Sequence, residues 1–251
     1  MIKQYPILAD LHTHSISSGH GSRDTICQMA LAASLAGLQL MGISEHGPAT
    51  PGSVLPSYFS GIRLAPRKRW GVNFVYGAEV NILNLEGDVD LPWEILSALD
   101  YAIISIHPPQ FTPWEVPDLT QAYLSAFRHP KVRFLGHIDD ARFPVDFERL
   151  LKAAQAADIY PEINNNSLTP QAYRVDGQKN CRQLLKICKR LQLPVLLSSD
   201  SHGVAQVGDM GYALSLLEEC QFPPSLVLNS DPVLLQQILK RPSRNCRNRK
   251  I

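Results

Sequence analysis

Short apolar runs recur about seven times along the chain, and segments with a helical spacing of apolar residues separate them. This alternation predicts a parallel β-sheet whose faces are covered by helices. A closed barrel and an open, doubly wound sheet both satisfy the pattern. The chain has no linker and no break in composition, so we expect one domain over residues 1–240 and a basic tail over 241–251. The expected strands are 6–14, 38–43, 72–78, 101–106, 132–136, 159–163 and 194–199.

The segments between these strands divide into expected helices and loops. Residues 47–60 are rich in Pro, Gly and Ser, which is typical of a loop, and the basic stretch 63–69 is expected to be a solvated helix end. Residues 108–117 are expected to form a lid or a substrate wall, and 225–229 a short extra strand. The spacing predicts helices over 23–36, 119–127, 146–154, 178–191, 204–220 and 232–239.

Composition argues against several classes of protein. The formal net charge is +1, which gives no overall field to attract nucleic acid or an anionic membrane. No window has the roughly 18 consecutive apolar residues of a membrane span, and no secretory signal is expected. The five cysteines form no C-x-x-C pair, so we expect reduced thiols in the cytoplasm. Composition leaves the oligomeric state open.

The first expected strand ends in two histidines, His12 and His14, two positions apart. Alternate side chains of a strand point to the same face, so both imidazoles can reach one point. Two imidazoles that converge at a strand end suit a divalent metal ion such as zinc. Because such a pair also occurs on ordinary polar strand faces, the other strand ends decide between the two interpretations.

The other expected strands end in the same kinds of residue. Parallel strands of an α/β barrel direct their carboxyl ends to one rim, where active sites are built. His20 follows shortly after the first strand, and His129 alone among the eight histidines lies away from the strand ends. The candidates that follow apolar runs are His12, His14, His46, Glu79, His107, His137, Asp200 and His202.

Seven histidines and two carboxylates make nine candidate ligands. One zinc ion takes three or four protein ligands, so nine ligands suit three ions when a carboxylate bridges two of them. Three divalent ions bring six positive charges and Glu79 and Asp200 remove two, so the pocket keeps about +4. Phosphate is the substrate group that such a pocket favours. Clustered ions also orient a phosphoryl group and lower the pKa of bound water toward about 7.

The strand ends form a series of motifs, which are Asp10-Leu11-His12-Thr13-His14, His20, Ser44-Glu45-His46-Gly47, Glu79, His107-Pro108, Gly136-His137, Glu162-Ile163-Asn164-Asn165 and Ser199-Asp200-Ser201-His202. This series resembles the PHP (polymerase and histidinol phosphatase) family, and within it the YcdX-type phosphatases. The resemblance covers residue 6 to about residue 220. It implies an α/β fold, a distorted seven-stranded (β/α)7 barrel similar to a TIM barrel, with a trinuclear metal centre at the C-terminal rim.

The resemblance also implies which residues hold each ion. Zinc is the expected metal, and iron and manganese are compatible with the family. Glu79, Asp200 and His202 are the expected catalytic residues. The implied ligand sets are His12, His14, Glu79 and Asp200 for the first ion, Glu79, His107 and His137 for the second, and His20, His46 and His202 for the third.

Four further residues are candidates for supporting the site or contacting substrate. Asp10 is expected to orient a ligand histidine. Glu162 and Asn164 stand at a strand end, either as supports or as partners of nearby backbone. After His20 the family tends to have a small residue and an aromatic one, whereas this chain has Gly21-Ser22-Arg23-Asp24. This departure suggests that Arg23 contacts the substrate phosphate; a solvated arginine is the alternative.

The leading expectation is a metal-dependent phosphoric monoester hydrolase in which a metal-bound hydroxide attacks phosphorus in line. Its expected partner is a small phosphorylated substrate, with no membrane and, despite the basic tail, no nucleic acid. Alternatives within the family are a histidinol-phosphate phosphatase and a phosphodiesterase or nuclease. Alternatives from other classes are a binuclear amidohydrolase, whose usual lysine is missing at the strand ends, and a non-catalytic metal-binding domain.

Overall fold

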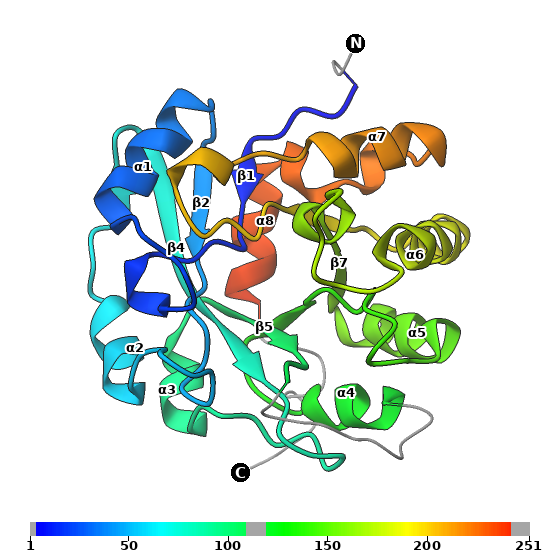
Figure 1. Cartoon of the computed structure of the whole chain (residues 1–251), viewed down its shortest axis with the longest axis horizontal. Helices are drawn as coiled ribbons and strands as arrows, with labels where there is room; N and C mark the ends of the chain where they lie inside the picture. Colours follow the sequence, from blue (N-terminus) through cyan, green and yellow to red (C-terminus); the bar gives the residue numbers. More distant parts are fainter. Residues whose placement is uncertain (1–3, 109–118, 242–251) are drawn as a thin grey trace.

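The chain forms a nearly closed barrel of seven parallel strands, which a computed structural model describes over residues 4–108 and 119–241 (Figure 1). Their order is β1-β2-β4-β5-β6-β7-β8, and β3 (Lys68–Arg69) pairs antiparallel with β4. The closed barrel is therefore confirmed over the open sheet. The parallel strands are β1 (Ala9–Asp10), β2 (Leu40–Ile43), β4 (Val72–Asn81), β5 (Tyr101–Ser105), β6 (Val132–Leu135), β7 (Tyr160–Asn164) and β8 (Leu196–Ser198).

Helices surround the strands, and local sequence explains where two of them begin (Figure 1). Thr25 and Gln28 form a capping box at the start of α1. The carboxylate of Asp146 accepts the N–H of Arg149 at the start of α5. The helices are α1 (Ile26–Leu35), α2 (Pro56–Ile62), α3 (Trp93–Ala98), α4 (Thr120–Ala126), α5 (Phe147–Ala157), α6 (Gly177–Leu191), α7 (Gly211–Glu219) and α8 (Pro232–Lys240).

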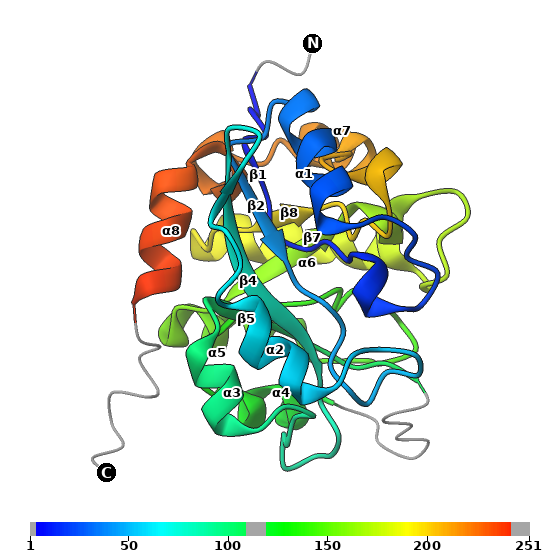
Figure 2. The same ribbon diagram turned by 90° about the vertical axis from the view of Figure 1, so that its left-hand side faces the viewer.

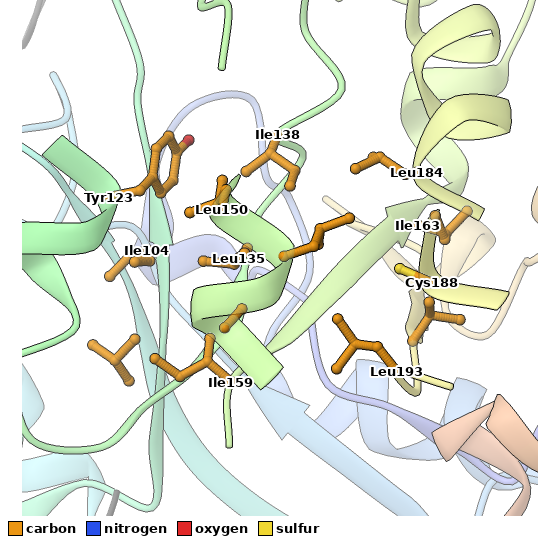
Figure 3. Packing of buried hydrophobic residues seen from close by; sticks show 14 of the residues in the cluster. Ile104, Tyr123, Leu135, Ile138, Leu150, Ile159, Ile163, Leu184, Cys188 and Leu193 are labelled. Atoms are coloured by element: carbon orange, nitrogen blue, oxygen red, sulfur yellow. The ribbon is translucent and has the colours of Figure 1, made fainter. Parts of the chain in front are cut away.

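Most of the hydrophobic core lies between the strands and the surrounding helices. Figure 3 shows part of this layer, in which Leu135 of β6 and Ile163 of β7 lie near Leu150 of α5 and Leu184 of α6. All four side chains are fully buried, and each such burial stabilises the fold by roughly 1.5–3 kcal/mol. This layer fixes the strands and therefore the rim above them.

A second core fills the barrel interior, and α8 covers one end of it (Figure 2). Leu235 and Ile238 of α8 pack into this inner cluster. Tyr101 crosses the interior, and its hydroxyl donates to the carbonyl oxygen of Leu11 at 2.5 Å. Gly42 makes room for it, because a Cβ there would lie 2.2 Å from the tyrosine oxygen. The interior is thus packed with side chains, and ligands have access at the rim.

The seam between β1 and β8 is closed by the side chain of Asn229. Its Oδ1 accepts the N–H of Leu197 at 2.7 Å, and its Nδ2 donates to the carbonyl oxygens of Leu197 and Ala9 at 2.8 Å each. Nearer the rim, Thr13 and Ser201 pair directly. One amide therefore replaces the missing strand-to-strand hydrogen bonds along this seam.

Two expectations near the C-terminus are wrong. Residues 225–229 form two 3-10 turns, Pro224–Leu226 and Leu228–Ser230, instead of a strand, although Val227 makes an isolated bridge to Val195. The expected helix over 204–220 begins only at Gly211, because Gly208 adopts a left-handed φ of +73°.

Two expectations for the segment after β2 are also wrong. The expected loop over 47–60 contains the start of α2, whose first residue is Pro56. The basic stretch 63–69 ends in β3, because Lys68 and Arg69 pair with Asn73 and Val72. The short helix α3 was not expected.

Some expectations fall outside the described residues. These are the lid over 108–117, apart from Pro108, and the basic tail after Arg241. The domain bounds stay a prediction. Within residues 4–108 and 119–241, none of the helices has the length and apolar character needed to cross a membrane.

Candidate metal centre

The parallel strands bring all nine candidate ligands together at one rim. Pairing continues just beyond the strands, where Thr13 pairs with Ser201 and His46 pairs with Glu79. His129 lies elsewhere, with Nε2 2.9 Å from the carbonyl oxygen of Gly87. The rim residues are His12, His14 and His20 after β1, His46 after β2, Glu79 within β4, His107 after β5, His137 after β6, and Asp200 and His202 after β8.

Glu79 is fully buried at the centre of this cluster. Its two oxygens face different histidines, which is the arrangement expected of a carboxylate shared by two ions. Oε1 lies 2.8 Å from His137 Nε2 and 3.4 Å from His107 Nε2, whereas Oε2 lies 2.7 Å from His46 Nδ1, 3.3 Å from His12 Nε2 and 3.5 Å from His14 Nε2.

Several buried atoms of the cluster have no hydrogen-bond partner. They include Nε2 of His12, His14 and His202, both ring nitrogens of His46, and Oε2 of Glu79. Burying polar atoms without partners costs about 1–3 kcal/mol each, so such atoms call for a ligand. Imidazole nitrogens and carboxylate oxygens are the donors that zinc and similar ions take. The residues present therefore fit metal ions.

Among the described residues there are three sets of donor atoms that could each hold an ion, and the atoms within each set lie within 4.8 Å of one another. The first set agrees with the ligands that the family resemblance implies for one ion. The other two combine residues that the resemblance assigns to different ions. The sets are His12, His14 and Asp200; His14, His46 and His202; and His46, Glu79 and His107.

His20 stands at the outer side of the cluster. Its ring centroid lies 5.2 Å from that of His46 and 5.7 Å from that of His202. The backbone is strained at three candidate ligands, because His20, His137 and Asp200 have φ of 53°, 28° and 51°. Such strain is typical of functional sites, where surrounding contacts hold an unfavourable conformation.

Glu162 supports the cluster from below. Its Oε1 lies 2.5 Å from His12 Nδ1, and its Oε2 accepts the backbone N–H of His137 at 2.7 Å. Asn164 Nδ2 donates both to Glu162 and to Asp200 Oδ2, at 3.2 and 3.1 Å. With Nδ1 of His12 donating to Glu162, Nε2 of His12 presents its lone pair to the cluster centre.

Asp10 plays a different part from the expected one. Its carboxylate accepts the backbone N–H groups of Gly208 at 3.0 Å and Ser199 at 3.3 Å, and the hydroxyl of Ser199. Its contact to His12 is a 3.5 Å approach to the backbone nitrogen, not to the ring. Asp10 therefore anchors the segments around Asp200 across the seam.

Electrostatics favour ligands in the metal-binding protonation state. Burial and the neighbouring His46 lower the pKa of His14, and burial and Arg174 lower that of His137 to about 4. Burial opposes ionisation of Glu79 and Asp200, but nearby histidines hold both carboxyl pKa values well below their usual range. These groups are therefore neutral imidazoles and charged carboxylates near pH 7.

His12 is the exception among the histidines. Burial disfavours its protonation, but Glu162, Glu79 and Asp200 outweigh burial and raise its pKa well above 6.5. Three acids around one imidazole create a strong demand for positive charge. A divalent cation at Nε2 meets the same demand as the proton.

A cavity of about 430 Å³ opens above the cluster. Its wall carries Arg142 and Arg174, which the sequence reasoning missed because loop arginines have no periodic signal. Arg23, the arginine chosen from sequence, is exposed and is not among the residues that line this cavity. The lining residues outside the nine candidate ligands are Thr50, Pro51, Ile106, Pro108, Asp140, Arg142, Asn166, Tyr173 and Arg174.

No family model matches the chain. A probable phosphatase of Clostridium novyi (strain NT) is 35% identical over 231 residues, which cover 92% of this chain and 93% of that protein. A probable phosphatase of Caldanaerobacter subterraneus is 37% identical over 235 residues, covering 93% and 91%. This chain belongs to their family.

The chain also shares its fold with a solved histidinol phosphate phosphatase of Lactococcus lactis. The TM-score is 0.59 at 21% identity, and the match covers 86% of this chain and 94% of the other. That protein was solved with zinc, L-histidinol and phosphate.

Proposed function

We propose that this phosphatase is a metal-dependent phosphoric monoester hydrolase of the PHP family, of the YcdX type, with a trinuclear centre at the barrel rim. The main support is the group of buried donor atoms around Glu79 that lack hydrogen-bond partners. The cavity above them carries the guanidinium groups of Arg142 and Arg174. Cations and guanidinium groups together suit the oxygens of a phosphate ester.

The proposed ions take the three ligand sets that the family resemblance implies. When bound, they supply the positive charge that holds phosphate oxygens and activates water for attack on phosphorus. The grouping of His12, His14 and Asp200 supports the first set. Zinc is the proposed metal, in line with the zinc of the Lactococcus lactis protein, and iron and manganese are alternatives.

The chain's own residues orient the groups around the phosphate. His202 Nδ1 lies 2.9 Å from the carbonyl oxygen of Asp200, so it donates there and keeps the lone pair of Nε2 for the cluster. Arg174 Nη2 donates to Asp200 Oδ2 at 2.8 Å. Its Nη1 donates to Ser167 Oγ at 3.2 Å, and the guanidinium lines the cavity, where a phosphate oxygen can accept a further N–H. Glu79, Asp200 and His202 are accordingly the proposed catalytic residues.

The charges of the wall suggest which leaving groups are accepted. Asp140 is paired with Arg142, whose guanidinium also stacks on Tyr173 at 4.1 Å. Asp200 is paired with Arg174. Among the described lining residues outside the ligand cluster, no carboxylate is left for the ammonium group of a substrate such as histidinol phosphate. We therefore propose esters with neutral or anionic leaving groups.

The test combines metal analysis with phosphate release. Elemental analysis of purified protein should give three metal atoms per chain. Activity is then compared on glycerol phosphate, phosphoglycerate, histidinol phosphate and an oligonucleotide 3′ end, with kcat/KM lowest for the last two. Asp200→Asn should lose metal and activity while its circular dichroism is unchanged. Wild-type turnover by this variant would refute the assignment, and a preference for histidinol phosphate would refute the leaving-group argument.

The alternatives from other classes receive less support. The carboxyl ends of the seven parallel strands carry no lysine, which the bridging group of a binuclear amidohydrolase would need. A non-catalytic domain would release no phosphate in the assay above. Cys27, Cys181, Cys188 and Cys220 are free thiols, which supports the proposal that the protein works in the cytoplasm.

A further inference from the structure

His107 can serve the cluster with only one of its two ring nitrogens. Its Nε2 lies 3.4 Å from Glu79 Oε1 and 3.2 Å from His137 Nε2, so Nε2 faces the centre. Its Nδ1 lies 2.8 Å from the side-chain Oδ1 of Asn81. A ligand nitrogen must present a lone pair, so His107 must carry its proton on Nδ1. Asn81 Oδ1 accepts the hydrogen bond from this Nδ1–H group.

Asn81 could in principle be turned either way, because its amide oxygen and nitrogen have nearly the same shape. A flipped amide would direct N–H groups at His107 Nδ1. Nδ1 would then have to accept a hydrogen bond, so the ring proton would lie on Nε2. A proton on Nε2 prevents that nitrogen from binding a metal ion. The orientation of the Asn81 amide therefore decides the tautomer of His107.

Asp90 is the group that can tell the two orientations apart. Asn81 Nδ2 donates to Asp90 Oδ2 at 2.6 Å and to Thr50 Oγ1 at 3.1 Å. An ionised carboxylate only accepts hydrogen bonds. A flipped Asn81 would place its oxygen against the carboxylate of Asp90, which is strongly unfavourable.

The Asp90 carboxylate is itself held firmly. It accepts the backbone N–H groups of Asn81 and Ala49, each at 3.0 Å. Gly47 allows the main chain to lie close to the Asp90 carboxylate, because a Cβ at this position would lie 2.3 Å from both carboxylate oxygens. Burial raises the pKa of Asp90, and its hydrogen bonds with Asn81 and Ala49 oppose that rise. The three donors, which are the backbone N–H groups of Asn81 and Ala49 and the side-chain Nδ2 of Asn81, all point at this carboxylate. This arrangement suits an ionised carboxylate, which only accepts hydrogen bonds.

We propose that Asp90 is a positioning residue that fixes the Asn81 amide and, through it, the metal-binding tautomer of His107. The inference rests on the proposed function, because it takes His107 as a metal ligand. Asp90 lies outside the nine candidate ligands and outside the lining of the cavity. Its effect on His107 passes through the side chain of Asn81.

The decisive variant is Asp90→Asn. An amide at this position can donate as well as accept, so it no longer discriminates between the two orientations of Asn81. The double variant Asn81→Asp with Asp90→Asn restores the discrimination. Its new carboxylate accepts both from the amide at position 90 and from His107 Nδ1–H. A merely structural role for Asp90 does not predict this rescue.

The matched control is Asp88→Asn. Asp88 lies two residues away in the same loop, but its side chain is 57% exposed and pairs with Arg128. The same change of charge there leaves Asn81 and His107 untouched. It therefore measures any general effect of losing a carboxylate from this loop.

The readout is the tautomer of His107, measured by ¹⁵N NMR of histidine-labelled, metal-free protein at about pH 9, where ordinary imidazoles are neutral. We expect Nδ1–H in the wild type, the control and the double variant, and a mixture or Nε2–H in Asp90→Asn. Metal affinity should fall by about 10- to 100-fold in Asp90→Asn and recover in the double variant.

An Nδ1–H signal retained by Asp90→Asn, or a double variant no better than Asp90→Asn, would overturn the inference. The proposed function is tested separately: it would be refuted if the metal-loaded wild type released no phosphate. Because the tautomer is read without metal or substrate, the two failures are distinguishable.

Discussion

Arg174 shows how one side chain adds to the rim what the ligands alone lack. It donates to Asp200 Oδ2 at 2.8 Å and to Ser167 Oγ at 3.2 Å, so its guanidinium is fixed before any substrate arrives. A fixed, planar cation beside the cluster suits a tetrahedral anion. Arg23 makes neither of these contacts, does not line the cavity and is exposed to solvent.

We predict that Arg174→Met raises KM for phosphate monoesters at least about 10-fold, because it removes a charge-assisted hydrogen bond of roughly 1.5–3 kcal/mol. Arg23→Ala is the matched control and should leave KM unchanged. Metal content is measured in both variants, since Arg174 also contacts Asp200. Equal KM values for the wild type and a metal-loaded Arg174→Met protein would exclude Arg174 from phosphate binding.

The gathering of the candidate ligands at one rim could be predicted from sequence because most of them directly follow an apolar run, as His107 follows β5 and His137 follows β6. The ends of parallel strands meet in space, so local pattern was enough. Arg174 and Asp90 could not be found in this way. Both residues lie in loops that fold back onto the rim, and the periodicity of the sequence does not predict how such loops fold.

Among the elements, the seam between β1 and β8 depends on a side chain instead of a strand. Asn229 satisfies the N–H and C=O of Leu197 and the C=O of Ala9 with one amide. The segment that ends at Asn229, residues 225–229, was expected to be a short extra strand between two helices. Instead, its turns place the amide between strands far away in sequence, which a local pattern cannot indicate.

We predict that Asn229→Ala lowers the free energy of unfolding by about 3 kcal/mol, because it leaves three buried backbone groups without partners. Urea unfolding followed by circular dichroism measures the change. Ser230→Ala is the control, since that hydroxyl donates only locally to Val227. If both variants unfolded at the same urea concentration, the seam would not depend on Asn229.

At the scale of the whole molecule, the rim gathers mutually repelling groups that a packed barrel holds together. Glu79, Asp200 and Glu162 are buried within a few ångströms of His12. The hydrophobic core clusters must supply the stability that this concentration of charge removes. Cations bound at the rim would relieve the repulsion and bind only the folded protein.

We predict that chelation lowers the melting temperature without unfolding the protein at 25 °C. An ion present at 1,000 times its Kd contributes about 4 kcal/mol, which corresponds to roughly 10 °C for a domain of this size. Differential scanning calorimetry with and without chelator measures the shift. Glu79→Gln should show a smaller shift, because two of the three proposed ligand sets include Glu79. A metal-loaded wild type that melts at the same temperature with and without chelator would contradict the proposed centre.

The closing contacts of the barrel also set the order of events during protein synthesis. His12 and His14 emerge from the ribosome well before Asp200, His202 and Asn229. A growing chain therefore cannot complete the ligand cluster at the rim until the residues of β8 and of the turn around Asn229 have been synthesised. The proposed metal centre therefore depends on contacts that the chain can make only after residue 229 has been added.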